Sequence, residues 1–164
     1  MVGRVQQKLR QRRKNKAGLS LRARALGMLA RREHSRLELA RKLAQYTENP
    51  DEIPSLLDDF ERQGWLSEQR VVEQVTASRR RRFGARRIAH ELRQKGIAEE
   101  AINAALPALT GTELEAARTV WRKKFSKAPR NAAERARQAR FLQGRGFTIE
   151  TALKVIGETQ YDDA

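Results

Sequence analysis

Two stretches of this chain share one pattern: residues 92–97 read Leu-Arg-Gln-Lys-Gly-Ile, and residues 142–147 read Leu-Gln-Gly-Arg-Gly-Phe. In both, a leucine is followed four residues later by a glycine and then by an apolar residue. Glycine readily adopts the left-handed backbone conformation that ends a helix. Each stretch therefore predicts a helix end, followed by an apolar side chain that folds back onto a core.

A third leucine extends this pattern toward the N-terminus. Leu43 precedes Leu92 by 49 residues, and Leu92 precedes Leu142 by 50. After Leu43 a longer loop containing Pro50 replaces the glycine stop, and the chain then reaches the apolar Ile53. A fixed period of this length is the signature of an internal repeat. We therefore expect the three leucines to be buried anchors of three similar repeats.

Apolar residues at helical spacing predict three helices in the first repeat. The first starts at Ser20 and should end near Arg32. The second opens at Ser35–Glu38, which matches a capping box. The third should end at Gly64.

The later repeats show the same order of helices. In the second, a helix over 85–95 precedes one that Pro107 should close. In the third, Thr112–Glu115 matches a capping box for the first helix, and the second should start near Asn131. Strand signals are almost absent, because no sustained alternation of β-branched residues occurs.

These patterns predict an all-α protein of three tandem three-helix repeats, each resembling a helix-turn-helix, that form an elongated, curved molecule. We place a basic flexible arm at 1–19 and the repeats at 20–68, 69–110 and 111–164, the last with a short C-terminal tail. Acidic residues on the third helices, such as Asp58 and Glu99, argue against sequence-specific reading of a DNA groove.

The composition points to an acidic or polyanionic partner. The chain has a net charge of +15 and an isoelectric point near 11.2, with 35 Lys and Arg against 20 Asp and Glu. Residues 1–24 carry no acidic residue. This arm has two open interpretations: a solubilising terminus, or a segment that contacts phosphates without a fixed structure.

Cysteine is absent, which excludes disulfides, thiolate zinc sites and a cysteine nucleophile. No apolar stretch approaches the roughly 20 residues that span a bilayer, and the N-terminus lacks the apolar core of a secretory signal. Import into an organelle is the lesser interpretation of the Arg-rich start. We therefore expect a cytoplasmic protein without membrane contact.

The sequence offers no catalytic constellation. Glycine-rich phosphate loops are missing. The only histidines, His34 and His90, fall in different repeats and lack metal-ligand spacing. Trp65 and Trp121 lie in apolar contexts that favour core packing over base stacking. An enzyme is the disfavoured class, and we expect no catalytic residue, cofactor or metal.

The densest local charge is the run of four arginines at 79–82. Adjacent like charges repel, so such a run is either a solvated helix end or a contact surface for phosphates or carboxylates. The helix that follows should place Arg86 and Arg93 on its outward side. The candidate residues for contact with a partner or nucleic acid are Arg79, Arg80, Arg81, Arg82, Arg86, Arg87, Arg93, Lys95, Lys123 and Lys124.

Three motifs in order resemble one family. Residues 32–43 read Arg-Glu-His-Ser-Arg-x-Glu-Leu-x-x-Lys-Leu, residues 87–97 read Arg-Ile-x-x-Glu-Leu-x-x-Lys-Gly-Ile, and residues 141–147 read Phe-Leu-x-x-Arg-Gly-Phe. Together they resemble the RecX regulatory proteins of bacteria, over about residues 22 to 157. The resemblance implies a modulator that lies in the groove of the RecA–DNA filament and inhibits ATP hydrolysis, strand exchange and the stimulated cleavage of the SOS repressor.

The chain departs from the family pattern at two places. The family commonly has an acidic residue, a spacer, Arg and an aromatic residue after the first repeat, whereas residues 68–71 read Glu-Gln-Arg-Val. The family often has Gly-x-Gly-Pro before the central helix, whereas residues 82–85 read Arg-Phe-Gly-Ala. The second change strengthens the central basic cluster.

The resemblance and the charge give a hypothesis and two alternatives. The arginines at 79–82, with Arg86 and Arg87, would meet acidic RecA surface or DNA phosphate and block filament movements. One alternative is a nonspecific nucleic-acid-binding protein that uses the arm and the Arg cluster. The other is a helical adaptor without DNA contact. We expect a monomer, because no heptad seam calls for a second copy.

Overall fold

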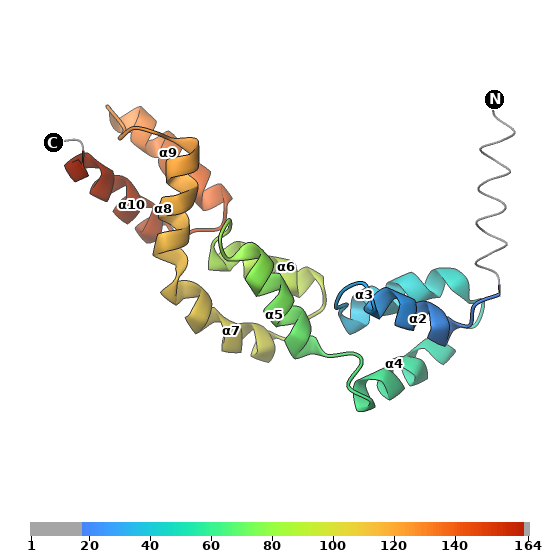
Figure 1. Cartoon of the computed structure of the whole chain (residues 1–164). Coiled ribbons are helices and arrows are strands. Elements are labelled where there is room, and N and C mark those ends of the chain that lie inside the picture. Colours follow the sequence, from blue (N-terminus) through green and yellow to red (C-terminus); the bar gives the residue numbers. More distant parts are fainter. Residues whose placement is uncertain (1–17, 163–164) are drawn as a thin grey trace, which may run out of the picture. The chain divides into compact units, whose positions relative to one another are not determined.

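A computed structural model of the chain describes residues 18–162, and their side chains up to Thr159 (Figure 1). The basic arm predicted at 1–19 lies almost wholly outside the described residues. Between residues 18 and 162 the chain forms nine α-helices and one short 3-10 helix, without a strand. The all-α prediction is therefore confirmed. The chain divides into a first unit ending at Ser67 and a second unit starting at Glu68.

The first unit holds one three-helix repeat. Its helices are α2 (Leu21–Leu29), α3 (Arg36–Leu43) and α4 (Glu52–Arg62), with the 3-10 helix η1 (Ala44–Tyr46) after α3. Helix α3 packs against α2 and α4. The core gathers the apolar side chains that face inward, which are Ala25, Leu39, Leu43, Ile53, Leu57, Phe60 and Leu66.

Local sequence explains where these helices begin and end. The Ser35 hydroxyl accepts the Glu38 N–H, and the Glu38 carboxylate accepts the Ser35 N–H, so the predicted capping box is formed. Gly64 has φ of +72°, the left-handed conformation expected at a helix end. Helix α2 is shorter than predicted, because it ends at Leu29.

The second unit holds six helices in two sets of three. The first set is α5 (Glu68–Arg79), α6 (Ala85–Gln94) and α7 (Glu99–Gly111), and the second is α8 (Glu113–Lys124), α9 (Ala132–Gly144) and α10 (Ile149–Asp162). Each set surrounds its own apolar cluster. Helices α5 and α6 pack on α7, and α8 and α9 pack on α10. The sequence repeat is thus a repeat in structure.

The three evenly spaced leucines are the predicted anchors. Leu43, Leu92 and Leu142 are each fully buried, and each belongs to a different cluster. Gly96 and Gly146 have φ of +76° and +88°, which ends α6 and α9 and returns the next apolar residue to the core. Ile97 and Phe147 are accordingly buried.

Two sequence predictions at the end of α7 are wrong. Pro107 does not close this helix, which continues one turn further to Gly111. Thr112 does not cap α8, because its hydroxyl donates back to the carbonyls of Ala108 and Leu109. The apolar side chain of Leu109, buried in the cluster of the second repeat, favours the extra turn over the proline stop. As a result, only Thr112 separates α7 from α8.

The two repeats of the second unit are joined by a close backbone contact. The Gly84 N–H donates to the Arg145 carbonyl at 2.9 Å. A Cβ on Gly84 would lie 2.2 Å from the Gly146 carbonyl oxygen, and one on Gly146 would lie 2.4 Å from the Arg87 Cβ. Only glycine fits at either position. We call this contact, with the nearby Glu113, the junction.

The Glu113 side chain adds two hydrogen bonds to the junction. Its buried side chain accepts the N–H of Ala85, the first residue of α6, and the N–H of Thr148, just before α10. One carboxylate thus satisfies free backbone donors at the starts of two helices from different repeats. Burial raises the pKa of Glu113, and the two backbone hydrogen bonds oppose that rise.

Candidate interaction surface

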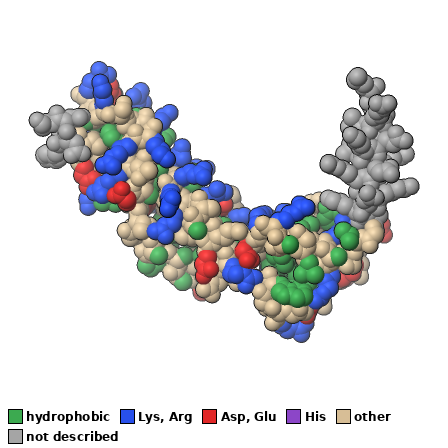
Figure 2. Space-filling model, in the orientation of Figure 1, with side chains coloured by type: hydrophobic (Ala, Val, Ile, Leu, Met, Phe, Trp, Pro, Cys, Tyr) green, Lys and Arg blue, Asp and Glu red, His purple; other side chains and the backbone are tan. Residues whose placement is uncertain are grey.

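Among residues 18–164 the net charge is unevenly divided; the seven Lys and Arg of residues 1–17 lie outside the described residues. Residues 18–67 carry eight Lys and Arg and eight Asp and Glu, so their net charge is zero. Residues 68–164 carry 20 Lys and Arg and 12 Asp and Glu, a net charge of +8. Figure 2 shows Lys and Arg side chains spread along the drawn face of the second unit, with fewer Asp and Glu among them. The second unit is therefore the better candidate for binding a polyanion.

Of the four arginines at 79–82, one forms an ion pair within the fold and three form none with a described residue. Arg79, the last residue of α5, donates to Glu91 on α6 at 2.9 Å, and this partner raises its pKa. Arg80, Arg81 and Arg82 follow in the turn, exposed and without an ion pair to any described residue. We call these three residues the basic turn.

The basic turn lines an open groove of about 1000 Å³. The opposite wall comes from the α7–α8 connection and from α8, and includes Thr112, Thr119 and the predicted Lys123. One carboxylate, Glu115, also lines the groove, and it pairs with Arg118 at 3.2 Å. This groove brings together four of the residues predicted for partner contact.

Helix α6 and its C-cap bring three further predicted residues to a second groove beside α9. Arg86, Arg87 and Lys95 line this open groove of about 830 Å³, which α9 closes with Gln143 and Gly144. Arg93 does not belong to it, because its guanidinium donates to Glu99 at the start of α7 and both side chains are thereby held. As predicted, Arg86 and Arg93 are exposed on the outward side of α6.

A row of alternating cations and aromatic rings crosses the junction. Phe83 lies between two arginines, with the Arg87 guanidinium 4.6 Å and the Arg145 guanidinium 5.4 Å from its centroid. The Arg145 guanidinium is also 5.4 Å from the centroid of Phe141, and the Lys124 ammonium is 5.8 Å from the same ring. We call these five residues the ladder.

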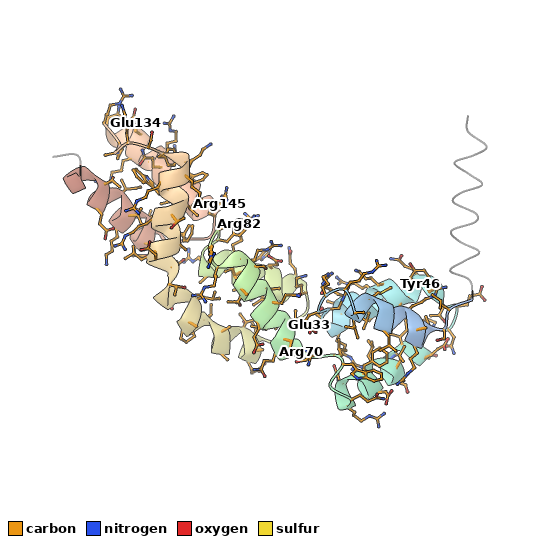
Figure 3. All side chains as sticks on the ribbon, viewed as in Figure 1. Glu33, Tyr46, Arg70, Arg82, Glu134 and Arg145 are labelled. Atoms are coloured by element: carbon orange, nitrogen blue, oxygen red, sulfur yellow. The ribbon has the colours of Figure 1, made fainter. Side chains whose placement is uncertain are left out.

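The ladder was missed in part by sequence reasoning. Arg87 and Lys124 are among the predicted contact residues, but Arg145 is not. In Figure 3 Arg82 and Arg145 lie close together, where the turn after α5 meets the end of α9. The available signal was the glycine pair at 84 and 146, since each glycine has an arginine and a phenylalanine within two residues of it.

The two tryptophans have different environments. Trp121 is buried as predicted, and its indole N–H donates to the buried Gln138 at 2.8 Å. Trp65 is not a core residue, because 41% of its surface is exposed. It lies edge-on to Phe60 with a centroid distance of 5.5 Å, and the Arg22 guanidinium stacks on both rings.

His34 is a structural residue of the first unit. Its Nδ1 lies 3.0 Å from the Arg32 carbonyl, and its Nε2 lies 3.1 Å from the Lys42 ammonium. An ammonium only donates, so Nε2 must accept and the ring is neutral with its proton on Nδ1. Burial is the largest cause of a lowered pKa at His34. His90 is instead exposed on α6.

Residues 18–162 contain no group of three or more His, Cys, Asp or Glu side chains placed to hold a metal ion. In the same part of the chain, no helix is both long and apolar enough to cross a membrane.

Comparison with known proteins identifies the repeats. Residues 67–106 match the family model of the second three-helix domain of RecX, and residues 112–156 match that of the third. A regulatory protein RecX from Leptothrix cholodnii is 49% identical over 142 residues, which cover 87% of this chain and 90% of the relative. The chain belongs to the RecX family.

Further relatives agree with this assignment, and two solved structures share the fold. The regulatory proteins RecX of Ralstonia nicotianae and Chromobacterium violaceum are 43% and 42% identical, over 84% and 89% of this chain and 87% and 95% of their own lengths. The crystal structure of RecX from Lactobacillus salivarius has a TM-score of 0.74 at 18% identity, covering 86% of this chain and 95% of that one. A second RecX crystal structure has a TM-score of 0.71 at 19% identity, covering 84% and 73%.

The structure explains one departure from the RecX pattern. Where the family often has proline, this chain has Ala85, whose N–H donates to Glu113 at 3.3 Å. Proline has no N–H, so a family member with proline there lacks this bond. The preceding glycine is retained because a Cβ at Gly84 would clash with the Gly146 backbone.

Proposed function

We propose that this RecX-family protein is a negative regulator of the RecA recombinase that binds in the groove of the RecA–DNA filament. There it inhibits ATP hydrolysis, strand exchange and the stimulated cleavage of the SOS repressor. The observation that carries the proposal is the match to proteins called regulatory protein RecX over most of both chains. The protein acts as a cytoplasmic monomer.

The charge distribution supports this function. Lys and Arg outnumber Asp and Glu in the second unit, and the basic turn forms no ion pair with a described residue, so its cations are available to acidic RecA surface or to DNA phosphate. The basic turn and the groove that it lines with Lys123 are the proposed contact. Arg79 and Arg93 are excluded from it, because Glu91 and Glu99 already hold them. Several weak contacts on one chain add to a useful affinity.

The deciding experiment is RecA ATPase activity on single-stranded DNA with substoichiometric amounts of this protein. A filament regulator should inhibit when it is far below the concentration of DNA sites. The alternative, a nonspecific nucleic-acid-binding protein, is favoured by the net charge of +8 on residues 68–164. It must compete for DNA, so it should inhibit only near saturation of the sites.

Charge reversal tests the basic turn. The triple variant Arg80→Glu, Arg81→Glu, Arg82→Glu leaves the Arg79–Glu91 pair intact and should reduce inhibition at least tenfold. A matched control carries the same charge change on exposed residues of α9 and α10: Arg135→Glu, Arg140→Glu, Lys154→Glu. If both triples inhibit equally while folded, the basic turn is not the contact.

A further inference from the structure

We infer that the ladder binds the phosphate backbone of a nucleic-acid strand through its three cations, Arg87, Arg145 and Lys124. The inference rests on the proposed function, because a regulator seated in a DNA filament needs a surface for the DNA. It adds a contact site that is separate from the basic turn and includes one residue, Arg145, that sequence reasoning left out. Its argument begins with what holds the cations in place.

Aromatic rings fix the positions of the cations. Phe83 separates Arg87 from Arg145, and Phe141 separates Arg145 from Lys124, so rings and charges alternate. A cation over a ring face is held by the quadrupole of the ring. A stacked guanidinium keeps the N–H groups of its edge directed outward, and these groups match phosphate oxygens. The row is therefore ordered before any ligand binds.

The backbone of the junction fixes the row as a whole. The two rings come from different repeats, since Phe83 precedes α6 and Phe141 lies on α9. The Gly84–Arg145 hydrogen bond and the close contact between Gly84 and Gly146 lie between them. Arg87 also donates to the Gly144 carbonyl at 3.2 Å, which spans the same junction. A preordered site loses less conformational entropy when it binds.

The cations of the ladder carry no ion pair with any described carboxylate. Arg22 in the first unit shows the contrasting case. It also stacks on two rings, Phe60 and Trp65, but its guanidinium pairs with Asp59 at 2.6 Å. In the ladder the same stacking occurs without neutralisation, on the unit whose net charge is +8. The three cations of the ladder thus carry positive charge that a bound anion would neutralise.

A phosphate backbone fits this arrangement better than an acidic protein. A nucleic-acid strand offers monoanions at regular intervals along one line, whereas carboxylates on a protein surface have no fixed spacing. Phe83 and Phe141 each already lie against two cations, so we assign the ladder to phosphates and not to base stacking. Binding should therefore be independent of base sequence and depend steeply on salt.

The test is binding of a fluorescein-labelled 20-mer of thymidylate to the full chain, measured by anisotropy across salt concentrations. The double variant Lys124→Gln, Arg145→Gln should lower the salt slope by about 1.4, because each single-strand contact contributes about 0.7. Each lost contact lowers the slope by about 0.7, and over the range from 1 M to 0.15 M salt this difference amounts to about fourfold weaker binding at 0.15 M. A slope equal to that of the unaltered chain would overturn the inference.

Three further variants show whether a change in binding comes from a lost contact, from the lower net charge or from altered folding. Arg122→Gln removes a cation of α8 that faces Glu158 instead of Phe141, and it should change binding less than twofold. Arg145→Lys keeps the charge and should retain most of the slope. Phe83→Leu, Phe141→Leu keeps the apolar bulk but removes the ring faces, so it should weaken binding. If Arg122→Gln acts as strongly as Arg145→Gln, net charge alone explains binding.

Competition with poly-glutamate tests the choice of partner. At matched charge it should displace the oligonucleotide at least tenfold less effectively than unlabelled thymidylate 20-mer. Equal displacement would assign the ladder to acidic protein and overturn the inference. The ATPase assay keeps the two proposals distinct. If the ladder variants lose DNA binding but the unaltered chain does not inhibit RecA, only the regulatory function is refuted. If the unaltered chain inhibits RecA but the ladder variants bind DNA as tightly as it does, only the ladder is refuted.

Discussion

The two units use one three-helix repeat in different ways. In the first unit, arginines on the surface meet carboxylates of the same unit: Arg36 pairs with Asp58 at 2.7 Å and with Glu61 at 3.0 Å, and Arg22 pairs with Asp59. Large apolar side chains such as Trp65 and Tyr46 are partly exposed there, and Figure 2 shows hydrophobic side chains on its drawn face. In the second unit, cations such as Arg80, Arg81 and Arg145 form no ion pair with a described residue. Repetition of a fold thus need not repeat a surface.

Two glycines, one from each unit, differ in how tightly they are enclosed. Gly64 of the first unit needs glycine only for its backbone conformation, since a Cβ there would meet nothing within 4 Å. Gly84 of the second unit has an ordinary φ of −75° but no room for a Cβ. Glycine is therefore required for its backbone conformation at position 64 and for close packing at position 84.

The largest expected effect comes from breaking the junction. Gly84→Ala drives a Cβ into the Gly146 carbonyl, where backbone and not a flexible side chain must move. We expect a loss of about 3 kcal/mol in the free energy of unfolding, at the upper end of overpacking effects. Chemical denaturation followed by circular dichroism measures it.

Gly64→Ala is the matched variant in the first unit. It places an L-residue at φ of +72° in open space, so it should cost only about 1–2 kcal/mol. Equal losses for the two variants would mean that enclosure at Gly84 adds nothing, and the difference between the units would then disappear.

A smaller effect is expected from introducing proline, the residue of the RecX pattern described above, at position 85. Ala85→Pro removes the N–H that donates to Glu113, while the extended Gly84 before it accepts a following proline. We expect a loss of about 1 kcal/mol, the worth of one buried hydrogen bond. Ala132→Pro, at the start of α9 where the Asn131 side chain caps the Glu134 N–H, is the control and should be nearly neutral. An Ala85→Pro variant as stable as the parent would show that the bond contributes nothing.

Much of the fold follows from the sequence, because periodicity reports on burial. Leu43, Leu92 and Leu142 recur at nearly one spacing, and each is fully buried in its own repeat. The end of α7 could not be predicted in this way. Pro107 and Thr112 carry strong local signals, but the packing of Leu109 decides where the helix ends.

The surface was less predictable than the core. Nothing in the run 79–82 distinguishes Arg79 from its neighbours, because its partner Glu91 lies on the next helix. The ladder joins residues that are more than 50 positions apart, such as Phe83 and Arg145, and only the junction brings them together. Sequence reasoning found the charge but could not tell which arginines were already neutralised.

The two buried titratable groups should give the units opposite responses to pH. Burial holds the pKa of Glu113 above its ordinary value of 4.5, so the folded chain binds this proton more tightly than the unfolded chain. Its favourable contribution is complete below pH 4.5 and is lost as pH rises through the folded pKa. Relative to Glu113→Gln, the unaltered chain should therefore lose stability between pH 4.5 and 7. A constant difference between their melting temperatures over that range would contradict this.

His34 should act in the reverse direction. Its folded pKa lies below the ordinary 6.5, so the unfolded chain takes up the proton first as pH falls. The contribution of neutral His34 is complete above pH 6.5 and is lost as pH falls toward the folded pKa. Thermal melts of the parent and His34→Gln between pH 7.5 and 5.5 should converge with acidification. The exposed His90→Gln is the control, and its melting temperature should follow that of the parent at every pH.

The smallest effect tests whether neutralisation is what separates the two stacked-arginine arrangements. Asp59→Asn removes the carboxylate from Arg22, which remains over Phe60 and Trp65 and becomes an unpaired stacked cation in the first unit. A lone cation of this kind lacks the row formed by the ladder, so the affinity for the thymidylate 20-mer should rise by about twofold or less at 0.15 M salt. Asp51→Asn makes the same change in charge just before α4, where the carboxylate pairs with no described residue, and should raise affinity less. Equal gains in the two variants would show that net charge governs binding, and that the position of an arginine over a ring does not matter.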